Sequence, residues 1–368
     1  MNKPYVHKGI AGVGGHVDGS QSLCDPDRLQ VYPRDDGWHL EKPAIGDFQW
    51  WYFDIMDAKT GCVLKIVLHV GTDPMKRRVF PQLALSVKVG GSSQAITREY
   101  RMEDLKASPD RCDVALRDEI RIIAEHSAEY PVYSLSIDIP EFKAGLTFTG
   151  ETQGWKPLGD KVPVQKGTKR GEFFWAVAAP KASVHGEFVF RGKRHKLENA
   201  LGYHDQNYWK AGPGKKLFMD DMIPRWYWGK CYAGEYTVIF MEIRFKTHAL
   251  KSLMVAEGGQ IVHSSNNAAD IRAEEMKDDA QLKTSYPGRL RVSSTDHGFP
   301  FQALLESVEV VDRRDLLTGV PGLLKWLIKL LVSKPSYHGM LAEATVKIGD
   351  QEIKGSGIYE VMVFRSRG

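Results

Sequence analysis

The sequence has 368 residues, enough for about two domains of ordinary size. Hydrophobic residues make up 42% and charged residues 26%, which is ordinary for a globular protein. The formal net charge is only +4, and no stretch is rich in basic and aromatic side chains in the way that a nucleic-acid groove needs, so we expect no nucleic acid as a partner.

Most of the chain reads as short β-strands separated by turns rich in Gly, Pro and Asp. Alternating or β-branched runs occupy residues 63–70, 82–89, 133–139, 145–149, 183–191, 235–244, 288–293, 341–348 and 353–364. Many short strands of this kind predict an all-β protein built from antiparallel β-barrel or sandwich domains.

Three segments interrupt the strand pattern. Residues 102–105 and 268–280 are polar, and we expect a loop or a short helix in each. Residues 322–332 form an apolar run of helical length that ends before Pro335, with Lys325 and Lys329 on one face. This helix either packs on the core or lies at a cavity mouth or a membrane surface, where it would be a peripheral contact.

The best candidate for a domain boundary is the stretch 210–224, which is rich in Gly, Lys and Pro. It divides the chain into an N-terminal domain, residues 1–215, and a C-terminal domain, residues 216–368. Each part has a plausible domain size.

Residues 47–54 concentrate aromatic side chains on a single predicted strand. Alternation places Phe48, Trp50 and Tyr52 on one face and Trp51 and Phe53 on the other. One face can pack the core while the other lines a pocket, because Trp and Tyr combine a large apolar area with one polar group, an N–H or a hydroxyl. The alternative is an aromatic core strand.

Residues 202–209 (GYHDQNYW) carry many side chains that donate, accept or titrate, and the run looks too polar for a core strand. Alternation would put one set of side chains on one side of the strand, namely Tyr203, Asp205 and Asn207. The other side would carry His204, Gln206 and Tyr208. The alternative to a functional site is a polar loop or strand end.

A third aromatic stretch, with Trp226 and Trp228, leads into the predicted strand 235–244. There Phe240 and Glu242 share a face, and a carboxylate at the end of an apolar face is costly unless it is paired or functional. Glu242 is therefore a candidate acid, or it pairs with Arg244.

The sequence lacks the motifs of common cofactors and metals. Its four cysteines are far apart, its histidines show no metal-ligand spacing, and no nucleophile-elbow or dinucleotide motif is present. We expect neither a cofactor nor a metal. Scattered cysteines suit a reducing compartment, and no apolar run of membrane-spanning length or signal-peptide core is seen, so we expect a cytoplasmic protein, with membrane association as the alternative.

The segments 50–54 and 202–209 together resemble the motifs of the carotenoid 1,2-hydratase (hydroxyneurosporene synthase) superfamily of lipocalin-like proteins. The resemblance spans about residues 45–245, with weaker support up to residues 355–360. It implies two lipocalin-like antiparallel domains with one or two helices, a pocket for a hydrophobic ligand, and members that are hydratases or lipocalin-like Diels–Alderases.

The resemblance also shows where this chain departs from the hydratases. Their implicated His and Trp correspond to Gln206 and Tyr208 here, and their Tyr-x-Asp pair corresponds to Phe240 and Glu242. The carboxylate is kept, but the His and the Tyr are replaced. These changes argue against copying the hydratase mechanism onto this chain.

We therefore expect a cofactor-independent enzyme of secondary metabolism that cyclises a hydrophobic polyene, polyketide or isoprenoid. The alternatives are a hydratase or dehydratase of an isoprenoid double bond, and a non-catalytic carrier. The expected catalytic residues are Tyr203, Asp205, Gln206, Tyr208 and Glu242. The expected substrate-binding residues are Trp50, Tyr52, His204, Asn207, Trp209, Trp226, Trp228 and Phe240.

Overall fold

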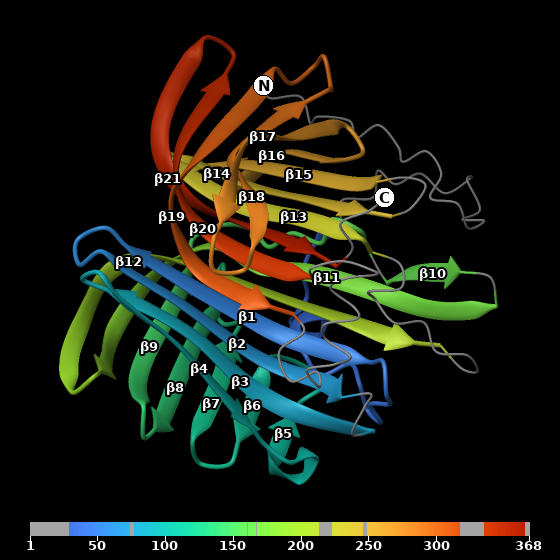
Figure 1. The fold of residues 1–368 in the computed structure, drawn as a ribbon, viewed down its shortest axis with the longest axis vertical. Coiled ribbons are helices and arrows are strands. Elements are labelled where there is room, and N and C mark those ends of the chain that lie inside the picture. The colour runs from blue at the N-terminus through green and yellow to red at the C-terminus, as the bar shows by residue number, and fades with distance from the viewer. Residues whose placement is uncertain are drawn as a thin grey trace. The chain divides into compact units, whose positions relative to one another are not determined.

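The computed structural model describes residues 29–73, 77–159, 161–166, 168–212, 223–245, 249–316 and 335–364. Within these residues the chain divides into two compact units, 29–212 and 223–364, each built on one antiparallel sheet (Figure 1). The expected all-β, lipocalin-like fold is confirmed. The domain boundary and the helix expected at 322–332 lie outside the described residues.

The first unit contains a twelve-stranded sheet with the order β4-β3-β2-β1-β12-β11-β9-β8-β7-β6-β5, and β10 pairs with β11. Its strands are β1 Phe48–Asp57, β2 Cys62–Asp73, β3 Arg78–Val89, β4 Ser92–Glu99, β5 Leu105–Ala107, β6 Asp113–Leu116, β7 Ile120–Glu125, β8 Val132–Ile139, β9 Phe142–Gly150, β10 Val162–Lys166, β11 Lys169–Phe190 and β12 Lys193–Ala211. Two short 3₁₀ helices, η1 Pro33–Asp36 and η2 Met102–Asp104, accompany them.

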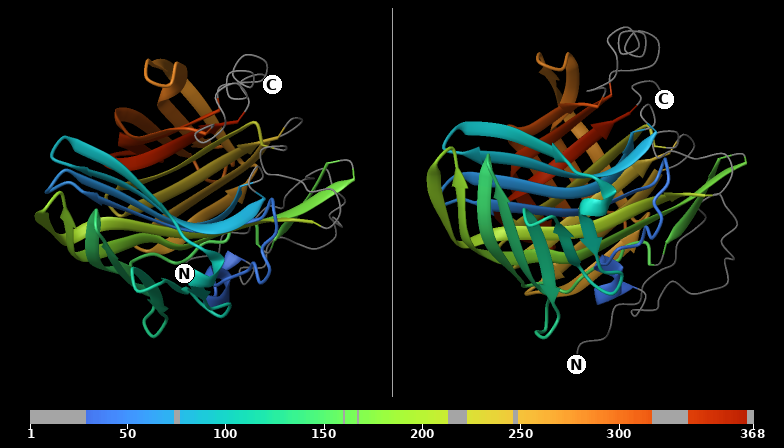
Figure 2. Two further views of the ribbon diagram at one scale, coloured as in Figure 1. Left: turned by 60° about the horizontal axis from the view of Figure 1, so that its bottom comes forward. Right: turned by 90° about the horizontal axis from the view of Figure 1, so that it is seen from below.

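This sheet curls, as Figure 2 shows for the blue-to-green strands, and its main hydrophobic core draws on strands from both ends of the sheet. Ile96 of β4 and Val114 of β6, near opposite ends of the strand order, belong to the same buried cluster as Trp51 and Phe53 of β1. The curl follows from alternation, because each strand directs one set of apolar side chains inward.

The second unit contains a nine-stranded sheet with the order β16-β15-β14-β13-β21-β20-β19-β18-β17. Its strands are β13 Arg225–Ala233, β14 Tyr236–Arg244, β15 Ala249–Glu257, β16 Gln260–Asn266, β17 Ala269–Asp279, β18 Thr284–Ser294, β19 Phe301–Asp315, β20 Ser336–Ile348 and β21 Gln351–Val363. Leu253 of β15, Phe240 of β14 and Ile271 of β17 belong to one core cluster, so this sheet also wraps its own core.

One expectation about local structure was wrong and another was confirmed. Residues 268–280 were expected to form a loop or short helix, but β17 is a strand that directs Ala269 and Ile271 into the core. Because β17 lies at one end of the sheet, most of its remaining side chains are exposed or half-buried and tolerate a polar sequence, although Asp279 at the end of the strand is buried. The short helix expected at 102–105 is present as η2.

Candidate functional site

The segment 202–209 lies at the centre of the first unit's sheet, on β12 between β1 and β11. All of its residues are buried, so the expectation that the run is too polar for a core strand was wrong. The strand tolerates these side chains because several are hydrogen-bonded to groups on neighbouring elements.

The pairing of β1 with β12 divides the segment between two faces. Trp51 lies opposite Gln206, and Phe53 lies opposite His204. Trp51 and Phe53 belong to the core cluster, so Gln206 and His204 share their inward face. The other face carries Tyr52 opposite Asp205, together with Trp50, Asp54, Tyr203 and Asn207. We call this second face of β1, β2, β11 and β12 the Asp205 face.

Two donors converge on one oxygen of Asp205. The Tyr203 hydroxyl donates to Asp205 Oδ2 over 2.7 Å, and Trp175 Nε1 donates to the same atom over 2.9 Å. Trp175 comes from β11 and is buried, as is Asp205. The two donors hold the Asp205 carboxylate in one orientation, so the group is a fixed acceptor on this face of the sheet.

Aromatic rings lie on the same face of the sheet as this polar group. Phe48 and Trp50 are stacked with ring centroids 4.8 Å apart, and His69 of β2 is tilted against Trp50 at 5.9 Å. Tyr52 meets Tyr203 edge to face at 6.0 Å. The half-buried Trp50 offers apolar area beside the carboxylate, as a site for an unsaturated ligand requires.

Two further charged side chains lie on the Asp205 face. Asp54 pairs in register with Tyr203 on one side and with Lys65 of β2 on the other. Lys65 is buried, and its Nζ lies 5.8 Å from the centre of the Tyr52 ring, at cation–π distance. Sequence reasoning missed Lys65 and Trp175, although Lys65 interrupts the apolar run 63–70 and so left a signal.

The amide side chain of Asn207 completes the Asp205 face. Its Oδ1 is buried and has no hydrogen-bond partner among the described residues. A buried acceptor in this state costs about 1–3 kcal/mol unless water or a ligand supplies a donor. Asn207 is therefore a position where a ligand hydroxyl or N–H group would bind.

His204 does not lie on the Asp205 face, and its expected role in substrate binding does not fit the structure. Its ring is fully buried and stacks on Phe53 with centroids 3.9 Å apart. Its Nδ1 lies 2.9 Å from the Tyr52 carbonyl oxygen and its Nε2 lies 3.0 Å from both carboxylate oxygens of Asp36. Both ring nitrogens are thus engaged inside the core.

Gln206 and Tyr208, expected as catalytic residues, share this inward face and so are separated from Asp205 by the sheet. Tyr208 packs with Phe174 at 5.3 Å and with His39 at 4.7 Å. Burial lowers the pKa of His39. Neither amide atom of the fully buried Gln206 has a hydrogen-bond partner among the described residues. The expected β12 set therefore divides between two faces.

Trp209 is on the same face as Asp205 by alternation and is fully buried. A Cβ added at Gly171 would lie 2.9 Å from the Trp209 ring, so the indole packs closely on the β11 backbone. Trp209 therefore supports the sheet and offers little area to a ligand.

The remaining expected residues belong to the second unit. Glu242 is buried and accepts hydrogen bonds from Arg244 at 2.9 and 3.2 Å, with Lys251 Nζ at 3.8 Å. Of the two alternatives for Glu242, the structure favours the ion pair. Phe240 is a core residue whose ring fills the space beside Gly229, where an added Cβ would lie 2.4 Å from it.

Trp226 and Trp228 lie on β13, on the face opposite Tyr227, which belongs to the core. The same face of β13 carries the fully buried Lys230, whose Nζ donates to the Tyr232 hydroxyl over 3.2 Å. This lysine was not expected from the sequence. The second unit thus has an aromatic and cationic face of its own.

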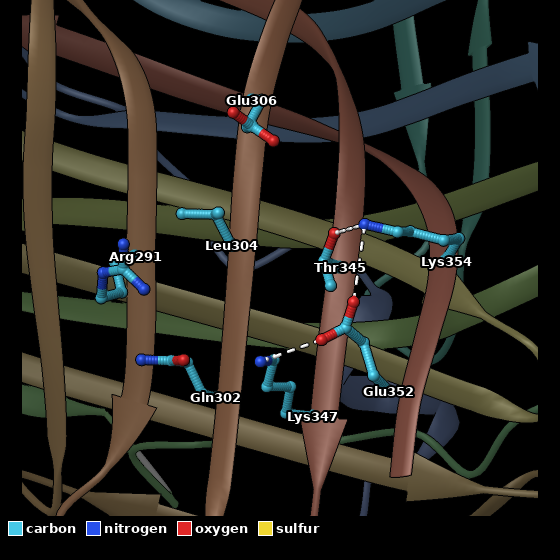
Figure 3. Close-up of a pocket in the computed structure, with 8 residues that line it drawn as sticks. All are labelled: Arg291, Gln302, Leu304, Glu306, Thr345, Lys347, Glu352 and Lys354. Atoms are coloured by element: carbon cyan, nitrogen blue, oxygen red, sulfur yellow. Dashed lines mark hydrogen bonds and ion pairs between the residues drawn. The ribbon is translucent and has the colours of Figure 1, made fainter.

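A hollow of about 220 Å³ on the second unit is shown in Figure 3. Its lining is polar and its charges are compensated: Lys347 pairs with Glu352 at 2.9 Å, and Lys354 donates to Thr345 over 2.8 Å. The lining residues are Arg291, Gln302, Leu304, Glu306, Thr345, Lys347, Glu352 and Lys354. This surface does not suit a hydrophobic ligand and contains none of the expected site residues.

Membrane contact was expected only for the segment 322–332, which lies outside the described residues. Among the residues that are described, no helix has the length and apolar character needed to cross a bilayer.

Comparison with solved structures supports the fold. A Nitrosomonas europaea protein with a provisional AttH assignment matches with a TM-score of 0.63 and 13% identity, over 92% of this chain and 98% of that one. CghA in complex with Sch210972 matches with a TM-score of 0.60 and 14% identity, over 92% and 97%. Kievitone hydratase from Nectria haematococca matches with a TM-score of 0.55 and 11% identity, over 91% and 98%.

No protein-family model and no curated protein matches the sequence. The chain therefore shares the all-β lipocalin-like fold of these structures, and their low identities establish the fold alone. The resemblance to the superfamily is supported at the level of the fold, and a relationship to carotenoid hydratases in particular stays a prediction.

Proposed function

We propose that this chain is a cofactor-independent enzyme that cyclises a hydrophobic, unsaturated small molecule on the Asp205 face. The observation that carries the proposal is the pair of donors, Tyr203 and Trp175, that converge on Asp205 Oδ2, on the face of the sheet that also carries the half-buried Trp50. The names of the structural neighbours support small-molecule chemistry, since one is a hydratase and another was crystallised with a ligand.

Cyclisation asks the protein mainly to hold a substrate in a reactive conformation and to place a few polar groups. The stacked Phe48 and Trp50 would bind a planar polyene segment, and Asn207 Oδ1 would accept a hydrogen bond from a substrate hydroxyl or N–H group. The Asp205 carboxylate would stabilise positive charge that develops on the substrate, or remove a proton.

Hydration of a double bond is the second candidate, favoured by the fold shared with kievitone hydratase. That reaction needs an acid that protonates an alkene. Glu242 accepts from Arg244, and Asp205 Oδ2 accepts from two donors, so both carboxylates already have hydrogen-bond partners within the protein. A carrier without catalytic activity is the third candidate.

One experiment separates the three. The chain is incubated in heavy water with a panel of linear conjugated polyenes that carry a hydroxyl or a ketone, and the products are analysed by mass spectrometry. Cyclisation gives a ring product that has gained no water, hydration adds one water with solvent deuterium on carbon, and a carrier returns the probe unchanged. Asp205→Asn is expected to abolish cyclisation, with Glu257→Gln, an exposed carboxylate on β15, as the control.

If product forms at the same rate in Asp205→Asn, the Asp205 face is not the site. If Glu242→Gln instead abolishes product while Asp205→Asn does not, the hydratase assignment replaces the cyclase.

A further inference from the structure

The core of the first unit contains a compact group of three potential metal ligands, Asp36 of η1, Cys112 before β6 and His204 of β12. Their ligand atoms all lie within 4.8 Å of one another, and all three residues are fully buried. Each comes from a different part of the chain, so no sequence spacing could reveal the group.

The hydrogen bonds of His204 define the tautomer that a metal requires. Nδ1 lies 2.9 Å from the Tyr52 carbonyl oxygen, which only accepts, so Nδ1 carries a proton. Nε2 then faces Asp36 Oδ1 and Oδ2, each at 3.0 Å. A lone pair on Nε2 and a carboxylate repel each other unless a cation lies between them. That cation is either a proton or a metal ion.

The surroundings match the outer shell of a metal site. The Tyr133 hydroxyl donates to Asp36 Oδ2 over 2.8 Å and would orient the carboxylate, while the Tyr52 carbonyl orients the imidazole. Phe53 stacks on the His204 ring and fixes its plane. Metal-ligating histidines and carboxylates usually have such partners.

We propose that Asp36, Cys112 and His204 bind one zinc-type divalent cation inside the first unit. The donor set is one thiolate, one imidazole and a carboxylate that offers both oxygens, which gives four donors of the kinds zinc prefers.

Charge balance favours this occupant in a buried place. A divalent cation releases the Cys112 thiol proton and the proton shared by Nε2 and Asp36, and its two positive charges then equal the thiolate and carboxylate charges. The proposal does not depend on the proposed function, since the cation would act by holding η1 and β12 together.

Elemental analysis and cobalt substitution test the proposal on the full chain. We expect about one zinc per chain after refolding with zinc and dialysis, and a thiolate-to-cobalt charge-transfer band when cobalt replaces zinc. Cys112→Ser should lose this band. Cys231→Ser, which removes another fully buried free cysteine, should keep it.

A second variant covers the case in which Cys112→Ser does not fold. Tyr133→Phe keeps every donor and should weaken zinc binding about 10–100-fold by loosening Asp36. A wild-type chain that folds but retains no metal would overturn the proposal. So would a charge-transfer band that persists in Cys112→Ser, an unchanged zinc affinity in Tyr133→Phe, or nitrogen NMR of the zinc-refolded chain showing protons on both ring nitrogens of His204.

Discussion

Tyr203 and Asp205, two residues apart on β12, are joined by a buried hydrogen bond of 2.7 Å on the face of the sheet that points away from the core. Residues i and i+2 of a strand share a face, so the two side chains can reach each other directly. It fixes the orientation of the carboxylate on which the proposed chemistry depends.

Tyr203→Phe should destabilise the first unit by about 1–3 kcal/mol, because the change removes a hydrogen bond to a buried carboxylate. The free energy of unfolding in urea measures the effect. Tyr100→Phe is the matched control, since Tyr100 donates over 2.8 Å to the more exposed Glu119 and should cost less. Equal losses in both variants would contradict a special role for Tyr203.

The alternation of the β1 and β12 segments could be predicted from the sequence. It correctly separated Trp50 and Asp205 from Trp51 and His204, because the period of a strand depends only on local geometry. Alternation therefore assigned the β12 residues to the correct faces. The expected site residues, however, were taken from both faces, which cannot line one pocket.

The partners of these side chains could not be predicted. Asp36 is 168 positions away from His204, and Trp175 reaches Asp205 from a β11 strand whose register shifts after residue 176. Bulges and long-range pairings depend on tertiary packing, which no local pattern records. For the same reason, the strand β17 at one end of the second sheet could not be predicted from the polar sequence of residues 268–280.

Glu242→Gln should destabilise the second unit by about 1–3 kcal/mol, since an amide replaces the carboxylate that accepts from Arg244. Thermal unfolding measures the loss, with Glu257→Gln as the exposed control. If Glu242 serves only in this ion pair, turnover on the polyene panel should stay within about twofold of wild type. A variant of normal stability but no activity would restore Glu242 as a catalytic acid.

Gly202→Ala should destabilise the first unit by about 1–3 kcal/mol through overpacking. An added Cβ would lie 2.4 Å from a Val184 methyl carbon and 2.9 Å from the Phe148 ring, both buried in the core. Gly145→Ala on β9 is the control, because nothing lies within 4 Å of the position of its Cβ. Urea unfolding of the two variants checks the prediction, and a neutral Gly202→Ala would show that the core yields at this position.

The stability of the second unit should depend on the pH through His338 and Asp279, whose side chains meet at 3.0 Å. Burial lowers the pKa of His338, and the hydrogen bond to Asp279 only partly opposes this, while Arg313 lowers the pKa further. The unfolded chain then binds more protons than the folded one below about pH 6.5, so stability falls as the pH decreases toward the folded pKa of His338.

Asp279 extends the same trend to lower pH. Burial opposes its ionisation, but hydrogen bonds from the Leu282 backbone N–H and from His338 lower its pKa. Its contribution is present above the unfolded pKa of about 3.9 and is lost as the pH falls through the lower folded value.

NMR titration of the histidine rings checks the contribution of His338, with the exposed His297 as reference. A His338 ring that titrates at or above the pKa of His297 would contradict it, and His338→Gln should flatten the stability profile between the folded pKa and about pH 6.5.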